Sequence, residues 1–258
     1  MLRLGIVPAR LASTRFPEKV IQDIDGIPMI CHTLKQVEKC KKLDRIFVAI
    51  DSEKTRKAIN SCATGAGAKI LMTSDDHATG TDRISEVVDI VDDCFGIDDN
   101  DIVINIQGDE PMIDPNCIDA LVEEMEDGCD LATIASTELT RSHLYDENVV
   151  KVIKNKEHEV VDFVRKVTGE GVPNYLDSKE GYEIFKHIGL YAYTKKSLNR
   201  FVSLPQSDNE KERSLEQLRA LDNGFKINAF VSSYSSLSVD TVDDFILAKS
   251  LIEGEKGP

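Results

Sequence analysis

The sequence is short of positive charge and has no long apolar run. It contains 31 Lys and Arg residues against 46 Asp and Glu residues, which gives a formal net charge of −15 and a pI of about 4.8. An acidic chain repels polyanions, so these counts argue against non-specific nucleic-acid binding and against an anionic membrane surface. Apolar runs such as Ile102–Ile106 are far shorter than the roughly 20 residues that span a bilayer. We therefore expect no membrane-spanning segment.

Several common motifs are also missing. The six Cys residues form no C-x-x-C pair and have no His at metal-ligand spacing, so a zinc site has little support. The chain of 258 residues shows no signal peptide, and its scattered Cys residues are predicted to be free thiols of a cytoplasmic protein rather than three disulfides. Neither the Walker A pattern nor G-x-G-x-x-G occurs. Any nucleotide site must therefore use a different loop.

Short β-branched runs alternate with helical stretches, and this alternation predicts an α/β sheet rather than a helical bundle or a β-sandwich. The predicted strands are Leu2–Val7, Arg45–Ile50, Lys69–Met72, Asp101–Ile106, Leu131–Ser136, Val149–Ile153, Val160–Val164, His187–Tyr193 and Lys226–Val231. The predicted helices are Met29–Cys40, Ser52–Gly65, Thr81–Val91, Pro115–Glu124, Leu215–Leu221 and Thr241–Leu251, and Gly169–Gly181 is a predicted polar loop. No internal repeat or linker divides the chain, so residues 1–258 are expected to form a single domain.

The first polar cluster, residues 8–19, follows the first predicted strand. Its small residues let the backbone approach a ligand, while Arg10, Arg15 and Lys19 supply positive charge that suits a polyphosphate. Residues 1–19 hold four cations against Glu18 alone, so this end of the chain is locally basic despite the acidic total. A solvated basic loop is the alternative interpretation.

Two further clusters follow predicted strands, and ligands of open α/β sheets bind beyond the carboxyl ends of their strands. Asp109 comes after the most apolar strand, where a carboxylate could hold Mg²⁺ against nucleotide oxygens, whereas Glu110 points the other way in an extended chain. Asp240 stands before the last helix and is a candidate for a second metal ligand. The alternatives are a simple turn at Asp109 and a helix N-cap at Asp240.

Together, segments spread over nearly the whole chain resemble the 3-deoxy-manno-octulosonate cytidylyltransferases, or CMP-KDO synthetases, and more broadly the sugar-activating nucleotidyltransferases. In chain order these segments are Ile6-Val7-Pro8-Ala9-Arg10, Ser13-Thr14-Arg15-Phe16-Pro17 with Lys19, Asp25-Gly26-Ile27-Pro28-Met29-Ile30, Met72-Thr73-Ser74-Asp75-Asp76-His77, Gly80-Thr81-Asp82-Arg83, Asn105-Ile106-Gln107-Gly108-Asp109-Glu110-Pro111, His187-Ile188-Gly189-Leu190-Tyr191-Ala192-Tyr193, Leu215-Glu216-Gln217-Leu218-Arg219 and Val239-Asp240-Thr241.

The resemblance implies a Rossmann-like nucleotidyltransferase fold with a mixed, mostly parallel central sheet. It also implies a Mg²⁺-dependent condensation of CTP with a 2-keto-3-deoxy sugar acid, giving a CMP-sugar and pyrophosphate for lipopolysaccharide or capsule synthesis. By the same resemblance, Arg10 and Lys19 hold the triphosphate, and Asp109 and Asp240 bind magnesium; these four are the expected catalytic residues. The other residues expected around the nucleotide are Ala9, Ser13, Thr73, Ser74, Arg83 and Gln107.

The residues that the resemblance places on the sugar acid have strong structural alternatives. They are Gln107, Arg165, His187, Tyr191, Glu216 and Gln217, with Arg165 paired to the sugar carboxylate. His187 and Tyr191 alternate as core residues of a half-buried strand also would, and Glu216 and Gln217 could be surface residues of a helix. Arg83 could likewise serve only to pair with Glu86 on its own helix.

One segment departs from the family. The residues after Arg165 lack the Ile-Pro-aromatic stretch that family members carry near this position, so the identity of the sugar acid stays open between KDO, its 8-amino analogue and another acidic sugar. A nucleotidyltransferase with another substrate and a non-catalytic nucleotide-binding protein are the competing interpretations. Residues 149–195 resemble the family's sugar-binding and dimerisation region, which implies a homodimer.

Overall fold

A computed structural model of the chain describes residues 1–13, 15–62, 67–77, 79–168, 175–176, 181–235 and 237–254. The chain divides into two compact units. The first unit contains Met1–Asp119 and Ser236–Pro258, and the second contains Ala120–Ser235. The expected helix end at Gly65 and most of the expected loop Gly169–Gly181 lie outside the described residues.

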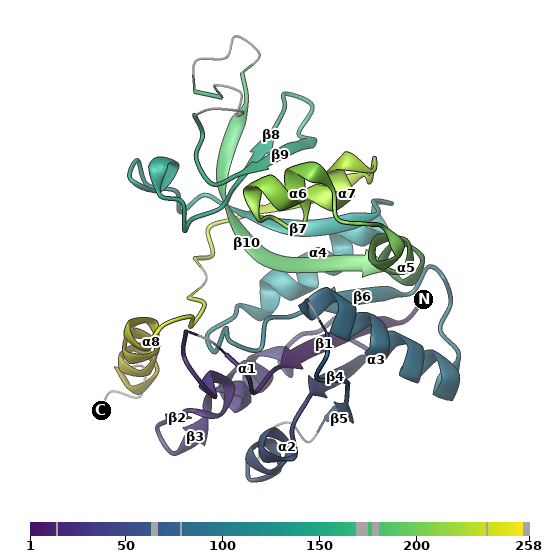
Figure 1. Cartoon of the computed structure of the whole chain (residues 1–258), viewed down its shortest axis with the longest axis vertical. Helices are drawn as coiled ribbons and strands as arrows, with labels where there is room; N and C mark the ends of the chain where they lie inside the picture. Colours follow the sequence, from purple (N-terminus) through teal and green to yellow (C-terminus); the bar gives the residue numbers. More distant parts are fainter. Residues whose placement is uncertain are drawn as a thin grey trace. The chain divides into compact units, whose positions relative to one another are not determined.

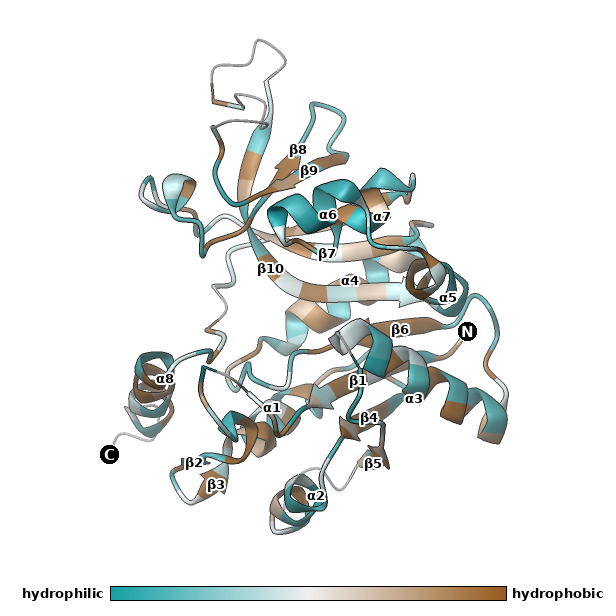
Figure 2. Cartoon of the chain, in the orientation of Figure 1, coloured by the Kyte–Doolittle hydropathy of each residue, from teal (hydrophilic) through white to brown (hydrophobic). Residues whose placement is uncertain are grey.

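The first unit is built on four parallel strands in the order β6, β1, β4 and β5 (Figure 1). These strands are β1 (Arg3–Ala9), β4 (Arg45–Ile50), β5 (Ala68–Met72) and β6 (Ile102–Asn105). Their central members are almost wholly apolar, as Figure 2 shows for β1 and β6, because a parallel sheet is covered on both faces. All four carboxyl ends therefore lie along one edge of the unit.

Five helices belong wholly or partly to this unit, and a tight hairpin lies beside them. The helices are α1 (Met29–Val37), α2 (Glu53–Asn60), α3 (Gly80–Phe95), α4 (Pro115–Glu126), which spans the boundary between the units, and α8 (Val242–Gly254). The hairpin pairs β2 (Asp23–Ile24) with β3 (Ile27–Pro28) through Asp25 and Gly26, which both have positive φ as such a turn requires. A 3-10 turn, η1 (Lys19–Ile21), precedes it.

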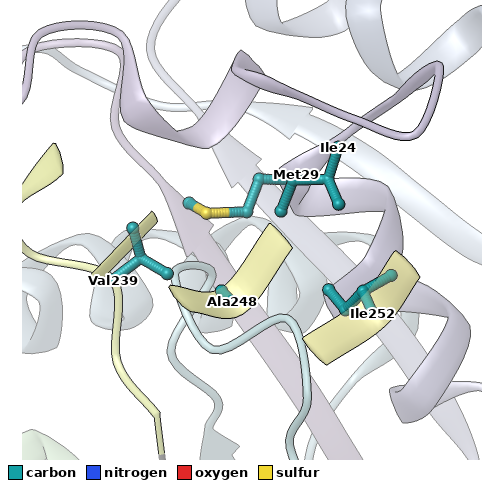
Figure 3. Packing of buried hydrophobic residues seen from close by; sticks show 5 residues of the cluster. All are labelled: Ile24, Met29, Val239, Ala248 and Ile252. Atoms are coloured by element: carbon teal, nitrogen blue, oxygen red, sulfur yellow. The ribbon is translucent and has the colours of Figure 1, made fainter. Parts of the chain in front are cut away.

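The C-terminal segment of the first unit, which contains Val239 and α8, packs against the rest of that unit through a small apolar cluster. Val239, Ala248 and Ile252 bury their side chains against Ile24 and Met29 (Figure 3). The backbone amide of Val239 also donates to the carbonyl of Asp109 at 2.9 Å. These contacts hold Asp240 beside the end of β6, although the two aspartates are far apart in sequence.

The second unit combines parallel and antiparallel pairing. Strand β7 (Leu131–Ser136) pairs in parallel with β11 (Ile227–Ser232) and antiparallel with β10 (Glu183–Thr194). A second antiparallel ladder joins β10 to β8 (Lys151–Lys154) and β8 to β9 (Val160–Val164). The remaining elements are α5 (Lys195–Ser203), α6 (Asp208–Arg213), α7 (Leu218–Asp222) and the 3-10 turn η2 (His143–Tyr145).

The prediction of an α/β fold with mixed, mostly parallel strands is confirmed. Arg45–Ile50, Leu131–Ser136 and Val160–Val164 have the predicted bounds. Helices α5 and α6 were not predicted, although Ser207 and Glu210 form a capping box whose S-x-x-E spacing is visible in the sequence. No helix in the described residues is long and apolar enough to cross a membrane.

The prediction that all six Cys residues are free is wrong for one pair. Cys31 in α1 and Cys62, just after α2, form a disulfide at a sequence separation of 31. Cys31 is fully buried, and sequence spacing alone gave no sign that it lies beside Cys62. Cys40, Cys94, Cys117 and Cys129 are free thiols.

Reduction of this disulfide is expected to lower the free energy of unfolding by about 4 kcal/mol, because the cross-link restricts the unfolded chain over a loop of this length. Urea unfolding followed by circular dichroism, with and without dithiothreitol, measures the effect. A Cys62→Ser variant is the control, since its midpoint is expected to be insensitive to the reductant. Equal midpoints for the native chain in both conditions would contradict the expectation.

Candidate active site

The functional candidates of the first unit gather at the carboxyl ends of its parallel strands. A cavity of about 460 Å³ opens there. It is lined by Pro8, Arg10, Ala12, Ser13, Arg15, Lys19, Val20, Gly80, Gln107, Gly108, Asp109 and Asp240. Six of the expected site residues, namely Arg10, Ser13, Lys19, Gln107, Asp109 and Asp240, are thus brought to one cavity. Ala9 lies at the end of β1 and is buried.

Lys19 is the centre of the polar contacts in this cavity. Its Nζ lies 2.6 Å from Asp109 Oδ2 and 3.0 Å from Asp240 Oδ1, and it donates to the carbonyl of Val239 at 2.9 Å. Burial disfavours the ammonium, but the two carboxylates outweigh that cost and raise the pKa of Lys19 above its ordinary value. The exposed Arg15 adds a second cation, 3.1 Å from Asp240 Oδ1. Two aspartates separated by 131 positions (240 − 109) therefore share one cationic neighbour.

One carboxylate oxygen of Asp109 takes no part in these contacts. Its Oδ1 is buried and has no hydrogen-bond partner among the described residues. A buried carboxylate oxygen without a donor is costly, and a cation placed at it would remove the cost. The donor set also suits a hard divalent ion, which prefers carboxylate oxygens. The residues present therefore fit a hard divalent cation such as magnesium at this carboxylate.

The position just before Asp109, occupied by Gly108, has no room for a side chain. A Cβ at Gly108 would lie 2.5 Å from the carbonyl oxygen of Pro8 and 3.1 Å from Ile30 Cδ1. Thr33 of α1 donates to the carbonyl of Gly108 at 3.2 Å. The turn is therefore pressed against the end of β1, and this close approach sets Asp109 opposite Lys19.

The nucleotide candidates Thr73, Ser74 and Arg83 form a second polar network beside the cavity. Arg83 is fully buried and donates through one terminal nitrogen to the hydroxyl of Thr73 and through the other to Asp51 Oδ2 at 3.3 Å. Arg83 forms its close ion pair with Asp51 rather than with Glu86, which bonds to His77 and accepts the backbone amide of Ser74. The Glu86 carboxylate still favours the charged guanidinium from a longer distance. Thr73 and Arg83 are buried, whereas Ser74 is exposed.

The expected sugar-side residues other than Gln107 belong to the second unit. On β10, the rings of His187 and Tyr191 lie 5.5 Å apart, and Phe163 packs edge-on against His187 at 5.1 Å. Thr133 Oγ1 lies 2.8 Å from the carbonyl of Leu190 and 3.0 Å from His187 Nε2. The threonine hydroxyl has one proton, which it donates to a carbonyl, so His187 Nε2 donates its proton to the hydroxyl oxygen. Burial lowers the pKa of His187 to about 3, so its imidazole is neutral at pH 7.

A β-bulge sets this arrangement. The register between β10 and β7 shifts between Ile188 and Tyr191, so that His187 faces Ala135 and Tyr191 faces Thr133. Burial, together with the nearby Glu216 carboxylate, raises the pKa of Tyr191 above its ordinary value. Both rings are thus uncharged and partly buried, and they can serve a ligand as flat surfaces and neutral hydrogen-bonding groups.

Arg165 is held by backbone carbonyls of the second unit. Its guanidinium donates to the backbone carbonyls of Glu147, Arg213 and Ser214 at 2.9, 3.0 and 3.0 Å. These bonds tie the end of β9 to the turn that follows α6. A carboxylate ligand would have to share the guanidinium with these carbonyls or displace them.

The placement of Glu216 and Gln217 on a helix needs correction. Both residues lie in the turn before α7, because Ser214 adopts a left-handed conformation and ends α6. Glu216 lies 3.8 Å from Arg219, and Gln217 is buried at the start of α7. The sequence prediction began this helix too early because Leu215 and Leu218 fit a helical spacing.

Comparison with known proteins decides the family. A family model described as cytidylyltransferase matches residues 4–227. The chain belongs to the cytidylyltransferase family. It is therefore an enzyme that transfers a nucleotidyl group, and the alternative of a non-catalytic binding protein is set aside. The residues that match include every expected nucleotide and metal residue except Asp240.

Relatives cover nearly the whole chain. An 8-amino-3,8-dideoxy-manno-octulosonate cytidylyltransferase from Shewanella pealeana is 38% identical over 95% of this chain and 96% of its own length. The protein of the same name from Shewanella frigidimarina is 38% identical over 93% and 94%. Among solved structures, a CMP:2-keto-3-deoxy-manno-octonic acid synthetase complexed with CTP matches with a TM-score of 0.85 and 31% identity, covering 99% of this chain and all of that one. The predicted nucleotidyltransferase fold is confirmed.

Proposed function

We propose that this enzyme condenses CTP with a 3-deoxy-octulosonate sugar acid to give a CMP-sugar and pyrophosphate. The observation that carries the proposal is the Lys19 contact with Asp109 and Asp240, which places an anion-binding cation and two magnesium-type carboxylates in one cavity. The structurally similar protein is a synthetase of this type complexed with CTP. The acceptor of the Shewanella relatives, by name, is the 8-amino sugar.

In the proposed reaction, the anomeric hydroxyl oxygen of the sugar bonds to the α-phosphorus of CTP, the bond to the pyrophosphate oxygen breaks, and the hydroxyl proton is released to solvent. Arg10 and Lys19 bind the triphosphate and stabilise the charge that accumulates on the leaving pyrophosphate. Asp109 and Asp240 would hold a magnesium ion, which would supply Lewis-acid polarisation of the phosphate and favour the deprotonated form of the sugar hydroxyl.

The remaining nucleotide candidates bind and orient the substrate. Ala9, Ser13 and Gln107 stand at the ends of β1 and β6, while Thr73, Ser74 and Arg83 stand beside the end of β5. On the sugar side, we propose that His187, Tyr191, Glu216 and Gln217 contact the acceptor, and that Arg165 pairs with its carboxylate. Fixing both reactants in this way removes much of the entropic cost of their encounter.

The test is release of pyrophosphate in the presence of Mg²⁺, each of the four nucleoside triphosphates and a panel of sugar acids. We expect release only with CTP and a 3-deoxy-octulosonate, and faster release with the 8-amino sugar than with its 8-hydroxy counterpart. A higher rate with the 8-hydroxy sugar would change the preferred acceptor and leave the reaction class standing. No release with any pair would overturn the proposal.

The assembly and cellular setting are part of the same proposal. We propose a cytoplasmic homodimer whose residues 149–195 contribute to sugar binding and to the dimer contact, and whose product serves lipopolysaccharide or capsule synthesis. Support comes from the resemblance of this segment to the family's dimerisation region. Sedimentation velocity at micromolar concentration tests it, and a monomer under those conditions would overturn the dimer.

A further inference from the structure

Asp51 occupies the end of β4 and has no role in the proposed reaction described so far. Its side chain is only 8% exposed. Both carboxylate oxygens are nevertheless engaged: Oδ1 accepts the backbone amide of Leu11 at 2.9 Å, and Oδ2 accepts a terminal nitrogen of Arg83 at 3.3 Å. One buried side chain therefore bridges the loop after β1 and the helix α3.

The Leu11 amide lies in the loop that carries the cavity-lining residues Arg10 and Ser13. The backbone amides of such a loop have few partners in regular secondary structure. Side chains that accept these amides therefore fix the conformation of the loop. The bond from Leu11 to Asp51 fixes the backbone next to Arg10 against the rigid end of β4. The direction in which Arg10 leaves the loop is thereby restricted.

The Arg83 side of the bridge continues to the next strand. Arg83 also donates to the hydroxyl of Thr73, and Thr73 donates in turn to the carbonyl of Ile50, the residue before Asp51, at 3.0 Å. Asp51, Arg83 and Thr73 thus form a closed set of contacts across the ends of β4 and β5. Among the described residues, the buried Arg83 forms its ion pair with Asp51, so this carboxylate neutralises and orients the guanidinium.

We infer that Asp51 is a positioning residue for CTP, which acts through the Leu11 amide and the Arg83 guanidinium rather than by contacting the nucleotide. It couples the phosphate-binding loop to the residues beside β5, so that both sides of the nucleotide site are set by one carboxylate. This inference rests on the proposed function, because CTP is the ligand whose affinity it controls.

The decisive variant is Asp51→Asn. Both partners of Asp51 are donors, and a carboxamide offers one acceptor oxygen and one donor group of nearly the same size. Either the Leu11 amide or Arg83 is then left facing another donor. We expect the Kd for CTP, measured by calorimetry with Mg²⁺, to rise by about tenfold to a hundredfold. The KM for the sugar acid is expected to stay within about twofold of the native value, because the substitution is expected to weaken the binding of CTP and not that of the sugar acid.

Asp101→Asn is the matched control. Asp101 is also a buried carboxylate that accepts two backbone amides, from Leu2 at 2.6 Å and Asp98 at 2.9 Å, but it stands at the amino end of β6. The control is expected to lose thermal stability and to keep the native Kd for CTP.

The outcomes separate this inference from the proposed function. A rise in Kd for Asp51→Asn alone supports the positioning role. Equal affinity in both variants, whether both native or both weakened, overturns it, while pyrophosphate release by the native enzyme still supports the proposed function. Failure of the native enzyme to bind CTP or release pyrophosphate removes both.

Discussion

Asp109→Asn is expected to lower the rate of pyrophosphate release by about a thousandfold while the protein stays folded. In the native protein, Oδ2 receives the Lys19 ammonium at 2.6 Å, and Oδ1 is buried with no partner among the described residues. The asparagine side chain has the same size but no charge. Its amide group would also face either the ammonium or the position of the cation, and both are positive.

The rate is measured at saturating CTP and Mg²⁺, and circular dichroism with a thermal melt checks the fold. Asp114→Asn is a suitable control, because Asp114 lies nearby in sequence but accepts the backbone amide of Asn116 at 2.9 Å, near the start of α4. The control is expected to keep the native rate. Turnover near the native rate in Asp109→Asn would remove this carboxylate from the reaction.

Arg219→Met is expected to lower the free energy of unfolding by about 3–5 kcal/mol, because it leaves a buried carboxylate without its cation. Glu210 and Arg219 are 4% and 5% exposed, and the guanidinium meets both carboxylate oxygens at 2.6 and 2.9 Å. The same guanidinium lies 4.7 Å from the centre of the Phe201 ring. Methionine replaces the apolar part of this packing but not the charge.

Urea unfolding measures this loss, and Arg56→Met is the matched control. Arg56 pairs with Glu53 at 3.1 Å on the exposed face of α2, where an ion pair contributes less than about 1 kcal/mol. A second control replaces Glu210 by Gln in the Arg219→Met background and is expected to recover part of the loss. Equal destabilisation by Arg56→Met and Arg219→Met would contradict the buried-charge explanation.

The pH dependence of this pair has a definite sign. Burial opposes ionisation of Glu210, but the Arg219 guanidinium outweighs it and holds the pKa below the ordinary value of 4.5. A carboxyl with a lowered folded pKa contributes stability above its unfolded pKa and loses it as pH falls through the folded pKa. The stability that the ionised Glu210 contributes to the native chain is therefore expected to be complete at pH 7 and to be lost as the pH falls from 4.5 through the lowered folded pKa, as urea unfolding at a series of pH values measures.

The sequence predicted strand bounds well where a short apolar run had only the pattern of a buried strand. The run at β4 and the run at β7 are short, apolar and β-branched, and their bounds follow from that alone. Helix starts were harder. The helix at Leu215 was begun too early because the left-handed turn at Ser214 depends on local backbone geometry that apolar spacing does not encode.

The residues of the candidate site also divide into those that the sequence predicted and one that it missed. Arg10, Lys19, Asp109 and Asp240 could be chosen from the sequence, because each belongs to a segment resembling one family, and Arg10 and Asp109 also follow predicted strands closely. Asp51 was missed, although it too directly follows a strand. Its signal was the same as that of Asp109, but it lies in none of the segments that carry the resemblance.

By itself, the sequence determined the alternation of strands and helices, the locally basic first loop within an acidic chain and the family. Those properties reside in residue order, because hydrophobic period, charge and motif spacing are local. Only the tertiary structure decided that Lys19 lies between two aspartates 131 positions apart (240 − 109), that Cys31 meets Cys62, and that Asp51 holds both Leu11 and Arg83. Such partnerships depend on which strand ends and helices pack side by side, and packing of distant segments leaves no periodic trace in a single sequence.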